Sequence, residues 1–480
     1  MAVLELARMT PSEIALLRAV AAAADARIEP VLVGGVVRDA RLGRRRRPDV
    51  DVAVASGALA LARRVATGLG GSYVALDEER GAARVLAGGG QLDITDFRAP
   101  TLAEDLAARD FTVNALAVPV RALLGGRALI VDPVGGLPDL RARRLRPTGP
   151  RALTDDPLRA FRAVRLEATL GLRLTPSAAR AVIAAAPALA TVAAERVRDE
   201  LLALLALPDT ARALRRADRL RLLGVVLPEI EPMRVTRQPL PHRFPVLEHS
   251  LRAVDGADRV VARPEHLAPY GQELATHLGE PLSGGMARRD VLKLAALLHD
   301  VAKPETRGVI RGRVRFFGHD VRGAAKSRAI GERLRLPGRV VTALERLVRH
   351  HLRPLHLAGV GRVTPRARYR FYRDLGTETR DLLLLTLVDA AAVRGESPLA
   401  LWPRASLIHD LLGGWELQRE AAAIPALIRG GDVMTHFGLP PGPEIGRLLR
   451  RAREAQDLGL VHTREQALAY LDSILREPLQ

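Results

Sequence analysis

Cysteine is absent from this chain of 480 residues, lysine occurs only three times, and aromatic residues make up 3% of the sequence. The lack of cysteine excludes disulfide scaffolds, thiolate zinc sites, iron–sulfur clusters and cysteine nucleophiles. No apolar run reaches the roughly 18 residues that a membrane span needs, and charged residues interrupt the N-terminal stretch where a signal peptide would lie. We therefore expect a cytoplasmic protein that neither spans a membrane nor depends on disulfides.

Positive charge is carried almost entirely by arginine and is distributed unevenly. The chain has 73 Lys and Arg against 54 Asp and Glu, a net charge of +19. Residues 1–140 contain 17 cationic and 17 acidic residues, whereas 141–243 contain 20 and 10, and 301–395 contain 21 and 8. A uniform compositional bias would not produce this alternation, so we expect a polyanionic partner that contacts the two basic segments.

The patterns of apolar residues predict a multidomain chain. Residues 1–140 contain short apolar runs separated by glycine-rich turns and helical stretches, which predicts an α/β head with a mixed sheet and helices. Farther on, apolar residues recur at helical spacing, so we expect all-α structure to the end of the chain. A proline-rich linker is expected at 238–245. The predicted domains are a head at 1–140, a helical neck at 141–237, a body at 238–395 and a helical tail at 396–480.

The first set of residues with chemical potential lies in the head. A Gly-Gly turn at 34–35 follows one apolar run, and Asp49 and Asp51 lie within the next. Successive side chains of a strand point to opposite faces, so these two carboxylates project from the same face. Carboxylates are ligands that Mg²⁺ prefers, and small turn residues let backbone amides approach a phosphate. We predict a magnesium–triphosphate site, with Asp93 or alternatively Asp96 as a third acid.

The order of these features resembles the class II tRNA nucleotidyltransferase and bacterial poly(A) polymerase family. Three family motifs have counterparts at 34–39, 108–115 and 132–140. Ala108 replaces an arginine of the second motif, which leaves Arg109 to contact the triphosphate and ribose. The resemblance implies catalysis with two Mg²⁺ ions held by the paired aspartates. The nucleotide-binding residues that it implies in the head are Gly34, Gly35, Arg38, Asp39, Arg109, Asp110 and Asn114.

The neck is expected to read the incoming base. Asp156 is expected to be an N-cap, and the arginines that follow it recur at intervals of three along one helix. A carboxylate and a planar guanidinium together can pair with the Watson–Crick edge of a base. The resemblance assigns this pairing to Asp156 and Arg159 and further nucleotide contacts to Arg162 and Arg165. We expect the charged pattern at 195–200 to form a salt-bridged helix surface.

A second set of potential ligands lies in the body. An isolated histidine usually has a structural role, but here several occur in order with an adjacent His-Asp pair and a distant aspartate, donors that suit Mg²⁺, Mn²⁺ or Ni²⁺. This order resembles the HD phosphohydrolase superfamily. The ligands that it implies are His249, His299, Asp300 and Asp389, and His319 and His350 match positions that bind a second metal or phosphate in some members. The alternative is a helical body that supports RNA without binding metal.

Together the resemblances imply template-independent addition of C, C and A to the 3′ end of tRNA from CTP and ATP. Arg38 and Arg109 would clamp phosphates, while Asp110 and Asn114 would orient the sugar. An additional hydrolysis of RNA ends in the HD domain is consistent with its ligands. The sequence leaves open a poly(A) polymerase or an enzyme adding only CC or only A. From other classes, it leaves open an HD phosphohydrolase with an inert head and a non-catalytic RNA-binding protein.

Overall fold

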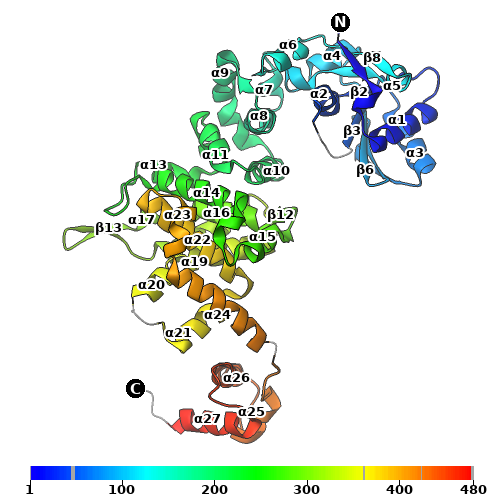
Figure 1. The fold of residues 1–480 in the computed structure, drawn as a ribbon. Coiled ribbons are helices and arrows are strands. Elements are labelled where there is room, and N and C mark those ends of the chain that lie inside the picture. The colour runs from blue at the N-terminus through cyan, green and yellow to red at the C-terminus, as the bar shows by residue number, and fades with distance from the viewer. Residues whose placement is uncertain (1, 45–48, 360–362, 423, 477–480) are drawn as a thin grey trace. The chain divides into compact units, whose positions relative to one another are not determined.

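The computed structural model of the protein describes residues 2–44, 49–359, 363–422 and 424–476 (Figure 1). The chain divides into two compact units, one formed by Met1–Glu200 with Arg216–Val226 and the other by Leu201–Arg215 with Leu227–Gln480. The chain passes from the first unit to the second within α10 (Ala194–Leu205) and returns to the first within α11 (Thr210–Arg219). The division into head, neck, body and tail stays a prediction.

A six-stranded mixed sheet forms the centre of the head, as the sequence predicts. Its strand order is β4-β5-β6-β3-β2-β7, with β3 parallel to β6 and the other neighbours antiparallel. The strands are β2 (Val31–Val33), β3 (Asp49–Val54), β4 (Ser72–Asp77), β5 (Ala82–Ala87), β6 (Gly90–Asp96) and β7 (Ala117–Pro119). A further pair, β1 (Val3–Glu5) and β8 (Arg127–Leu129), lies outside this sheet.

Amphipathic helices cover the sheet of the head. In α3 (Ala58–Leu69) the buried residues Ala58, Leu61, Ala62, Val65 and Ala66 recur at helical spacing and form one apolar stripe. The other helices of the head are α1 (Pro11–Ala23), α2 (Gly35–Arg41), α4 (Leu102–Ala107), α5 (Val120–Leu124) and α6 (Gly136–Arg141). Beyond them, the first unit continues with α7 (Ala152–Asp155), α8 (Leu158–Leu170), α9 (Pro176–Ala185) and α12 (Leu223–Val226).

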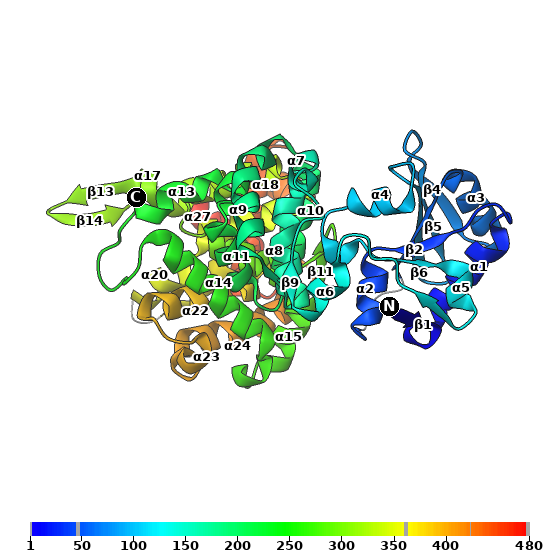
Figure 2. The same cartoon turned by 90° about the horizontal axis from the view of Figure 1, so that it is seen from above.

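The second unit is largely helical (Figures 1 and 2). Helices α14, α16 and α22 pack against one another, and α18 packs against α19. The helices up to residue 359 are α13 (Glu231–Val235), α14 (Val246–Ala262), α15 (Gly271–Gly279), α16 (Arg288–Leu298), α17 (Lys303–Thr306), α18 (His319–Arg333), α19 (Gly338–His350) and α20 (Arg353–Gly359). The later ones are α21 (Pro365–Leu375), α22 (Thr379–Arg394), α23 (Pro398–Leu401), α24 (Ser406–Ala422), α25 (Gly430–Phe437), α26 (Pro443–Asp457) and α27 (Arg464–Arg476).

Two features of the second unit differ from the sequence-based expectation of all-α structure. Residues Arg307–Ile310 and Arg313–Phe316 form an antiparallel hairpin, β13–β14, and β11 (Pro281–Ser283) pairs with β12 (Met286–Ala287). These strands escape detection because each is only two to four residues long, too short to show an alternating apolar pattern. None of the described helices is both long enough and apolar enough to cross a membrane.

Candidate nucleotide and metal sites

The three aspartates predicted in the head lie on neighbouring strands. In β3, Asp49 and Asp51 are exposed while Val50 and Val52 between and beyond them are buried, so the two carboxylates share one face. The parallel register of β3 and β6 pairs Asp51 with Asp93. The geometry thus favours Asp93 as the third acid, while the Asp96 carboxylate accepts a hydrogen bond from the Ala58 amide at 2.8 Å.

The environment of this carboxylate set suits a cation. The pKa of Asp51 is raised to about 6, first because surrounding protein desolvates its carboxylate and then because Asp93 repels its charge; Arg109 acts in the opposite direction. Asp93 itself receives two hydrogen bonds of 2.8 Å from Arg84. A hard divalent cation would relieve the repulsion between these oxygens, so the residues fit Mg²⁺.

Gly34 keeps space open beside the carboxylates. Its φ of +80° is favourable only for glycine, and a Cβ at this position would lie 3.3 Å from Asp51 Oδ2 and 3.5 Å from Arg109 Nη1. Arg109 donates its Nε and Nη2 protons to Asp105, with donor–acceptor distances of 3.3 and 3.1 Å. Its Nη1 lies on the side of Gly34 and Asp51.

Arg38, expected to clamp phosphates, contacts two side chains of the head. Its side chain is buried, its Nε and Nη2 donate to Asp39 at 2.8 and 3.0 Å, and its Nη1 donates to Asn114. All three nitrogens of the guanidinium thus have partners within the protein. In this geometry Arg38 orients Asn114, and the phosphate-clamping role expected for Arg38 stays a prediction.

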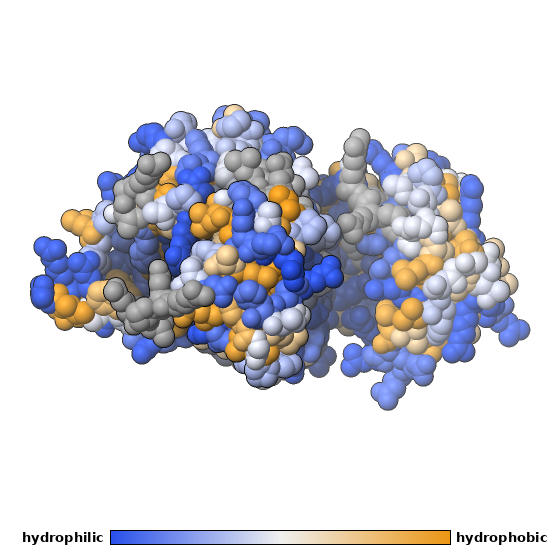
Figure 3. Space-filling model, turned by 90° about the horizontal axis from the view of Figure 1, so that it is seen from below, coloured by the Kyte–Doolittle hydropathy of each residue, from blue (hydrophilic) through white to orange (hydrophobic). Residues whose placement is uncertain are grey.

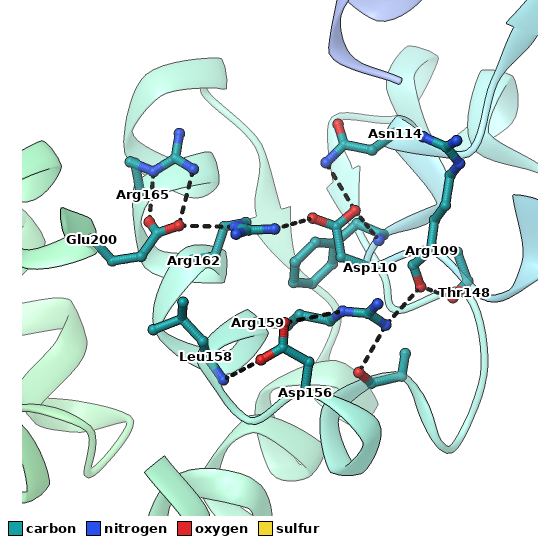
Figure 4. Close-up of polar contacts among 12 residues, drawn as sticks. Arg109, Asp110, Asn114, Thr148, Asp156, Leu158, Arg159, Arg162, Arg165 and Glu200 are labelled. Carbon is teal, nitrogen blue, oxygen red and sulfur yellow. Dashed lines mark hydrogen bonds and ion pairs between the residues drawn. The ribbon is translucent and has the colours of Figure 1, made fainter. Parts of the chain in front are cut away.

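A continuous polar network joins the head to helix α8 (Figure 4). Asn114 donates to Asp110 Oδ1 at 3.1 Å, and Arg162 donates from Nη1 to Asp110 Oδ2 at 3.3 Å. Arg162 also donates to Glu200 at 2.8 Å, and Arg165 donates to the same carboxylate at 2.7 Å. Glu200 therefore links Arg162 to Arg165, and Arg162 extends the network to Asp110 and Asn114. The ion pairs of Arg196, Arg198 and Glu200 confirm the salt-bridged helix expected at 195–200.

The predicted base-reading pair, Asp156 and Arg159, lies at the start of α8, where the N-cap is one residue later than expected. Pro157 occupies the N-cap position, while Asp156 precedes it and accepts a hydrogen bond from the Leu158 amide at 3.3 Å. Asp156 pairs with Arg196 at 2.8 Å and lies 3.9 Å from Arg159. The Arg159 guanidinium donates to the carbonyl oxygens of Ala108, Arg109 and Ala152. If Asp156 and Arg159 read a base, at least some of these contacts within the protein would be replaced by hydrogen bonds to the base.

A buried histidine cluster lies in the second unit. We use this term for six side chains that form two adjoining groups of potential ligands: His249, His299 and Asp389 in the first, and Asp300, His319 and His351 in the second. In the first group, His249 Nε2 lies 3.2 Å from His299 Nε2 and 3.0 Å from Asp389 Oδ1. Asp300 connects the groups, because its Oδ2 lies 3.2 Å from His299 Nε2 and its Oδ1 lies 3.4 Å from His319 Nε2.

The structure corrects the expected second ligand position from His350 to His351. His350 is the last residue of α19, is only half-buried and belongs to neither group. His351, the C-cap of the helix, is buried with its Nε2 3.2 Å from His319 Nε2. Adjacent residues at a helix end point about 100° apart, so only one of two consecutive histidines can face the cluster. The sequence motif gave no means of choosing between them.

Hydrogen bonds fix the histidine rings in a form able to bind metal. The Nδ1 atoms of His299, His319 and His351 lie 2.9, 2.6 and 2.7 Å from the carbonyl oxygens of Ala296, Phe316 and Val348. A carbonyl oxygen only accepts, so each Nδ1 carries a proton, and in the neutral ring each Nε2 is the nitrogen able to bind a metal. Both buried oxygens of Asp300 lack a hydrogen bond of good geometry among the described residues. Imidazole nitrogens and carboxylate oxygens in this arrangement fit a divalent transition metal.

Sequence reasoning missed three residues beside the cluster. Lys303 Nζ lies 2.6 Å from Asp300 Oδ2 and donates to Gln238 Oε1 at 2.6 Å. The His242 ring lies edge-on to His249, with centroids 5.3 Å apart, and burial with the nearby Lys303 lowers its pKa to about 4. The segment expected to be a linker therefore contacts the cluster. Its proline content hides this contact, although two polar side chains within a supposed linker were a usable signal.

Comparisons with known proteins match three parts of this chain to family models and most of its length to relatives. Family models match at residues 31–146 (Poly A polymerase head domain), 171–234 (Probable RNA and SrmB-binding site of polymerase A) and 246–393 (HD domain). An A-adding tRNA nucleotidyltransferase from Deinococcus radiodurans is 40% identical, covering 92% of this chain and 94% of the relative. A CC-adding tRNA nucleotidyltransferase from Thermus thermophilus is 37% identical, covering 92% of each chain. A Thermotoga maritima CCA-adding enzyme solved with tRNA shares the fold with a TM-score of 0.61, at 20% identity over 99% of this chain and 100% of that one.

Proposed function

Because this chain belongs to the class II tRNA nucleotidyltransferase and poly(A) polymerase family with an HD domain, we propose that it extends the 3′ end of tRNA. The observation that supports this most directly is the grouping of Asp49, Asp51 and Asp93 beside Gly34 and Arg109. Nucleotidyl transfer requires carboxylates that bind a metal ion, a positively charged side chain that binds phosphate, and space for the nucleotide between them.

In the proposed reaction, the 3′-oxygen of the tRNA attacks the α-phosphorus of a nucleoside triphosphate and pyrophosphate leaves. Mg²⁺ held by Asp49 and Asp51, when bound, would lower the pKa of the attacking hydroxyl and neutralise phosphate charge. Arg109 holds the triphosphate through Nη1, and Gly34 leaves room for it. Asp110 and Asn114, fixed by Arg162 and Arg38, orient the sugar.

The base is selected in this proposal by Asp156 and Arg159. Both lie at the start of α8, beside the arginine network that orients the sugar. On binding a nucleotide, Asp156 would exchange Arg196 for the base, and Arg159 would exchange at least one carbonyl partner. Arg162 and Arg165 support this site through Glu200, so nucleotide contact by these two arginines is secondary to positioning.

We further propose that the chain adds part of the CCA sequence, and not all of it. Two relatives align with this chain over more than nine-tenths of both chains. One is an A-adding enzyme and the other is a CC-adding enzyme. The CCA-adding enzyme from Geobacillus stearothermophilus, in contrast, matches over 38% of this chain. The expectation of full CCA addition is therefore the alternative outcome of the same test.

The test uses tRNA transcripts that end before CCA, after the first C and after CC, each with CTP, ATP or both. Extension of only the transcript ending in CC, and only with ATP, identifies an A-adding enzyme. Extension by two C residues that then stops identifies a CC-adding enzyme. Completion of all transcripts with both nucleotides would show full CCA addition, and long adenosine tails would show a poly(A) polymerase. No extension of any transcript would refute the proposed transfer.

We propose a second activity, metal-dependent hydrolysis of phosphate esters at RNA ends, for the histidine cluster. The specific observation is that Nδ1 hydrogen bonds direct the Nε2 atoms of three buried histidines toward two adjoining sets of donors. His249, His299 and Asp389 would hold one divalent ion, and Asp300, His319 and His351 a second. Such ions supply a nucleophilic hydroxide at neutral pH. Release of phosphate from RNA carrying a 3′-phosphate or 2′,3′-cyclic phosphate, in the presence of Mg²⁺, Mn²⁺ or Ni²⁺, tests this activity.

A further inference from the structure

The β13–β14 hairpin leaves the helical part of the second unit between two residues at the histidine cluster. It begins directly after α17, which starts at Lys303, and it ends just before His319. The turn residues Arg311 and Gly312 have φ angles of 50° and 72°, typical of the tight turn of a two-residue hairpin. Figures 1 and 2 both show the hairpin extending away from the helices of this unit. Residues 307–317 are called the hairpin arm below.

The hairpin arm is strongly basic and also partly apolar. It contains no acidic residue, and its four exposed arginines form no ion pair within the described parts of the chain: Arg307, Arg311, Arg313 and Arg315. Three of its hydrophobic residues are well exposed, Val309 at 62%, Ile310 at 50% and Phe317 at 71%. Figure 3 shows hydrophilic and hydrophobic residues side by side at the far left of the view, where Figure 1 places the hairpin.

The strand register separates these side chains into two faces. Ile310 lies opposite Arg313, and Gly308 lies opposite Arg315, so both arginines project from one face. Val309 lies opposite Val314 on the other face. One face therefore presents two cations at alternate positions of a strand, a spacing of about 7 Å that matches successive phosphates of an extended single strand.

The base of the hairpin arm adjoins the histidine cluster. The Phe316 carbonyl oxygen accepts the Nδ1 hydrogen bond of His319 at 2.6 Å, so the arm directly fixes one potential ligand. The Lys303 ammonium, 2.6 Å from Asp300, lies 5.6 Å from the centroid of the Phe316 ring. Lys303 and His319 keep 8% and 7% of their side-chain surface exposed, whereas His249, His299 and Asp300 keep 1%. Asp389, on α22, keeps 12%, so the cluster is less completely covered at Asp389 and at the two residues that flank the arm.

We propose that the hairpin arm binds single-stranded RNA and guides its 3′-phosphorylated end to the histidine cluster. Arg313 and Arg315 contact successive phosphates, and Phe317 stacks on a base near the 3′ end. Unpaired arginines combined with an exposed aromatic ring match a nucleic acid better than an acidic protein, which offers no flat base to stack on. The inference rests on the hydrolysis proposed for the cluster, which supplies the reason for an RNA end to approach it.

The first experiment measures binding of the full chain to a short fluorescent single-stranded RNA with a 3′-phosphate, by anisotropy at several salt concentrations. R313E/R315E should weaken binding about tenfold or more and reduce the salt dependence, because phosphate contacts are lost. F317A should weaken binding about fivefold with little change in salt dependence, because a stacking contact is lost. The matched control is R450E/R451E, which makes the same charge change at two exposed arginines of α26. Equal losses in the two double variants, or no loss in R313E/R315E, would overturn the proposal.

The second experiment locates the RNA end without requiring hydrolysis. A 4-thiouridine at the 3′-terminal position is activated by light, and the crosslinked peptide is identified by mass spectrometry. Crosslinks within residues 303–319 support guidance to the cluster, and crosslinks found only elsewhere overturn it. If wild-type protein releases no phosphate from the RNA but the crosslinks and the binding losses are observed, the hydrolysis proposal fails while RNA binding by the arm stands. Binding of anionic lipid vesicles that depends on the arm, without RNA binding, would also overturn the proposal.

Discussion

The carboxylates of the head and the histidine cluster both gather potential metal ligands, but they are assembled over very different lengths of chain. Asp49 and Asp51 are two residues apart on one strand, with Asp93 on the neighbouring strand. The cluster takes its ligands from α14, α18 and α22 and from the C-terminal ends of α16 and α19. Asp49 and Asp51 lie at exposed positions of β3 and Asp93 is half-buried, whereas the cluster is almost fully buried. An open site suits exchange of nucleotides and tRNA, while a buried one suits tightly held ions.

Asp51→Ala should have the largest effect and should separate the two sites. Loss of one carboxylate from the head should lower nucleotide incorporation by about 10³-fold or more, because cation binding and phosphate neutralisation both depend on it. Incorporation is measured by extension of a tRNA transcript, and tRNA affinity is measured alongside. The control is Glu79→Ala, which removes an exposed carboxylate from the turn between β4 and β5. Near-normal incorporation by Asp51→Ala would contradict the assignment.

Asp300→Asn should have the complementary effect. Removing a residue that only hydrogen-bonds to a metal ligand typically lowers metal affinity by about 10–100-fold. Loss of the Asp300 carboxylate, which is itself a potential ligand and connects the two groups, should therefore weaken divalent metal binding by at least about 100-fold. Metal content after dialysis, measured by mass spectrometry, checks this expectation. Extension of tRNA should stay within about twofold of wild type, because the head carboxylates and the cluster belong to separate compact units and share no residue. Unchanged metal content would contradict the proposed centre.

His351→Ala and His350→Ala should sharpen the description of the second group. His351 faces Asp300 and His319, so its loss should remove the ion held there and lower the metal content of the protein. His350 lies outside both groups, so its substitution should leave the metal content unchanged. The two variants differ by one position in the chain and serve as controls for each other. An equal loss of metal in both would show that the cluster is disrupted by any change at the end of α19.

Glu200→Gln should have a smaller effect that combines stability and nucleotide binding. Glu200 accepts charge-assisted hydrogen bonds from Arg162 and Arg165, and their loss should lower the free energy of unfolding by about 1–3 kcal/mol. Since Arg162 also holds Asp110, the KM for the nucleotide should rise about threefold to tenfold. Denaturant unfolding and steady-state kinetics measure the two effects. A change in stability alone would show that Glu200 does not position the nucleotide site.

The pH dependence of this same ion pair should give the smallest effect. Burial acts to raise the pKa of Glu200, but the hydrogen bonds and charges of Arg165 and Arg162 outweigh it, so the pKa lies below its ordinary value of 4.5. A lowered pKa in the folded state means that the stabilisation is complete above the unfolded value and is lost as pH falls through the folded value. The difference in Tm between wild type and Glu200→Gln should therefore be constant near neutral pH and shrink below about pH 4.5. A difference that persists at the lowest pH would contradict an ionic origin.

Comparison of the predicted and observed sites shows where local pattern suffices. The alternation along β3 and the glycines of the turn at 34–35 place the head carboxylates without knowledge of the rest of the fold. The structure brings together the nucleotide-binding residues predicted in the head and in α8, yet it assigns Arg38 to Asn114 and leaves Arg109 beside Asp51. A guanidinium has several donors, and its partners depend on distant segments that local pattern does not encode.

Local sequence patterns were enough to predict the mixed sheet of the head, the helical character of most of the remaining chain and most of the side chains that gather in the histidine cluster. These features depend on periodicity and on motifs whose members lie close together along the chain. The folded structure shows that His351 and not His350 faces Asp300, that Gln238 and His242 adjoin the histidine cluster, and that Glu200 holds α8 to α10. It also revealed the hairpin arm between Lys303 and His319. Each of these depends on packing between segments distant in sequence, where a rotation of one residue along a helix redirects a side chain by about 100°.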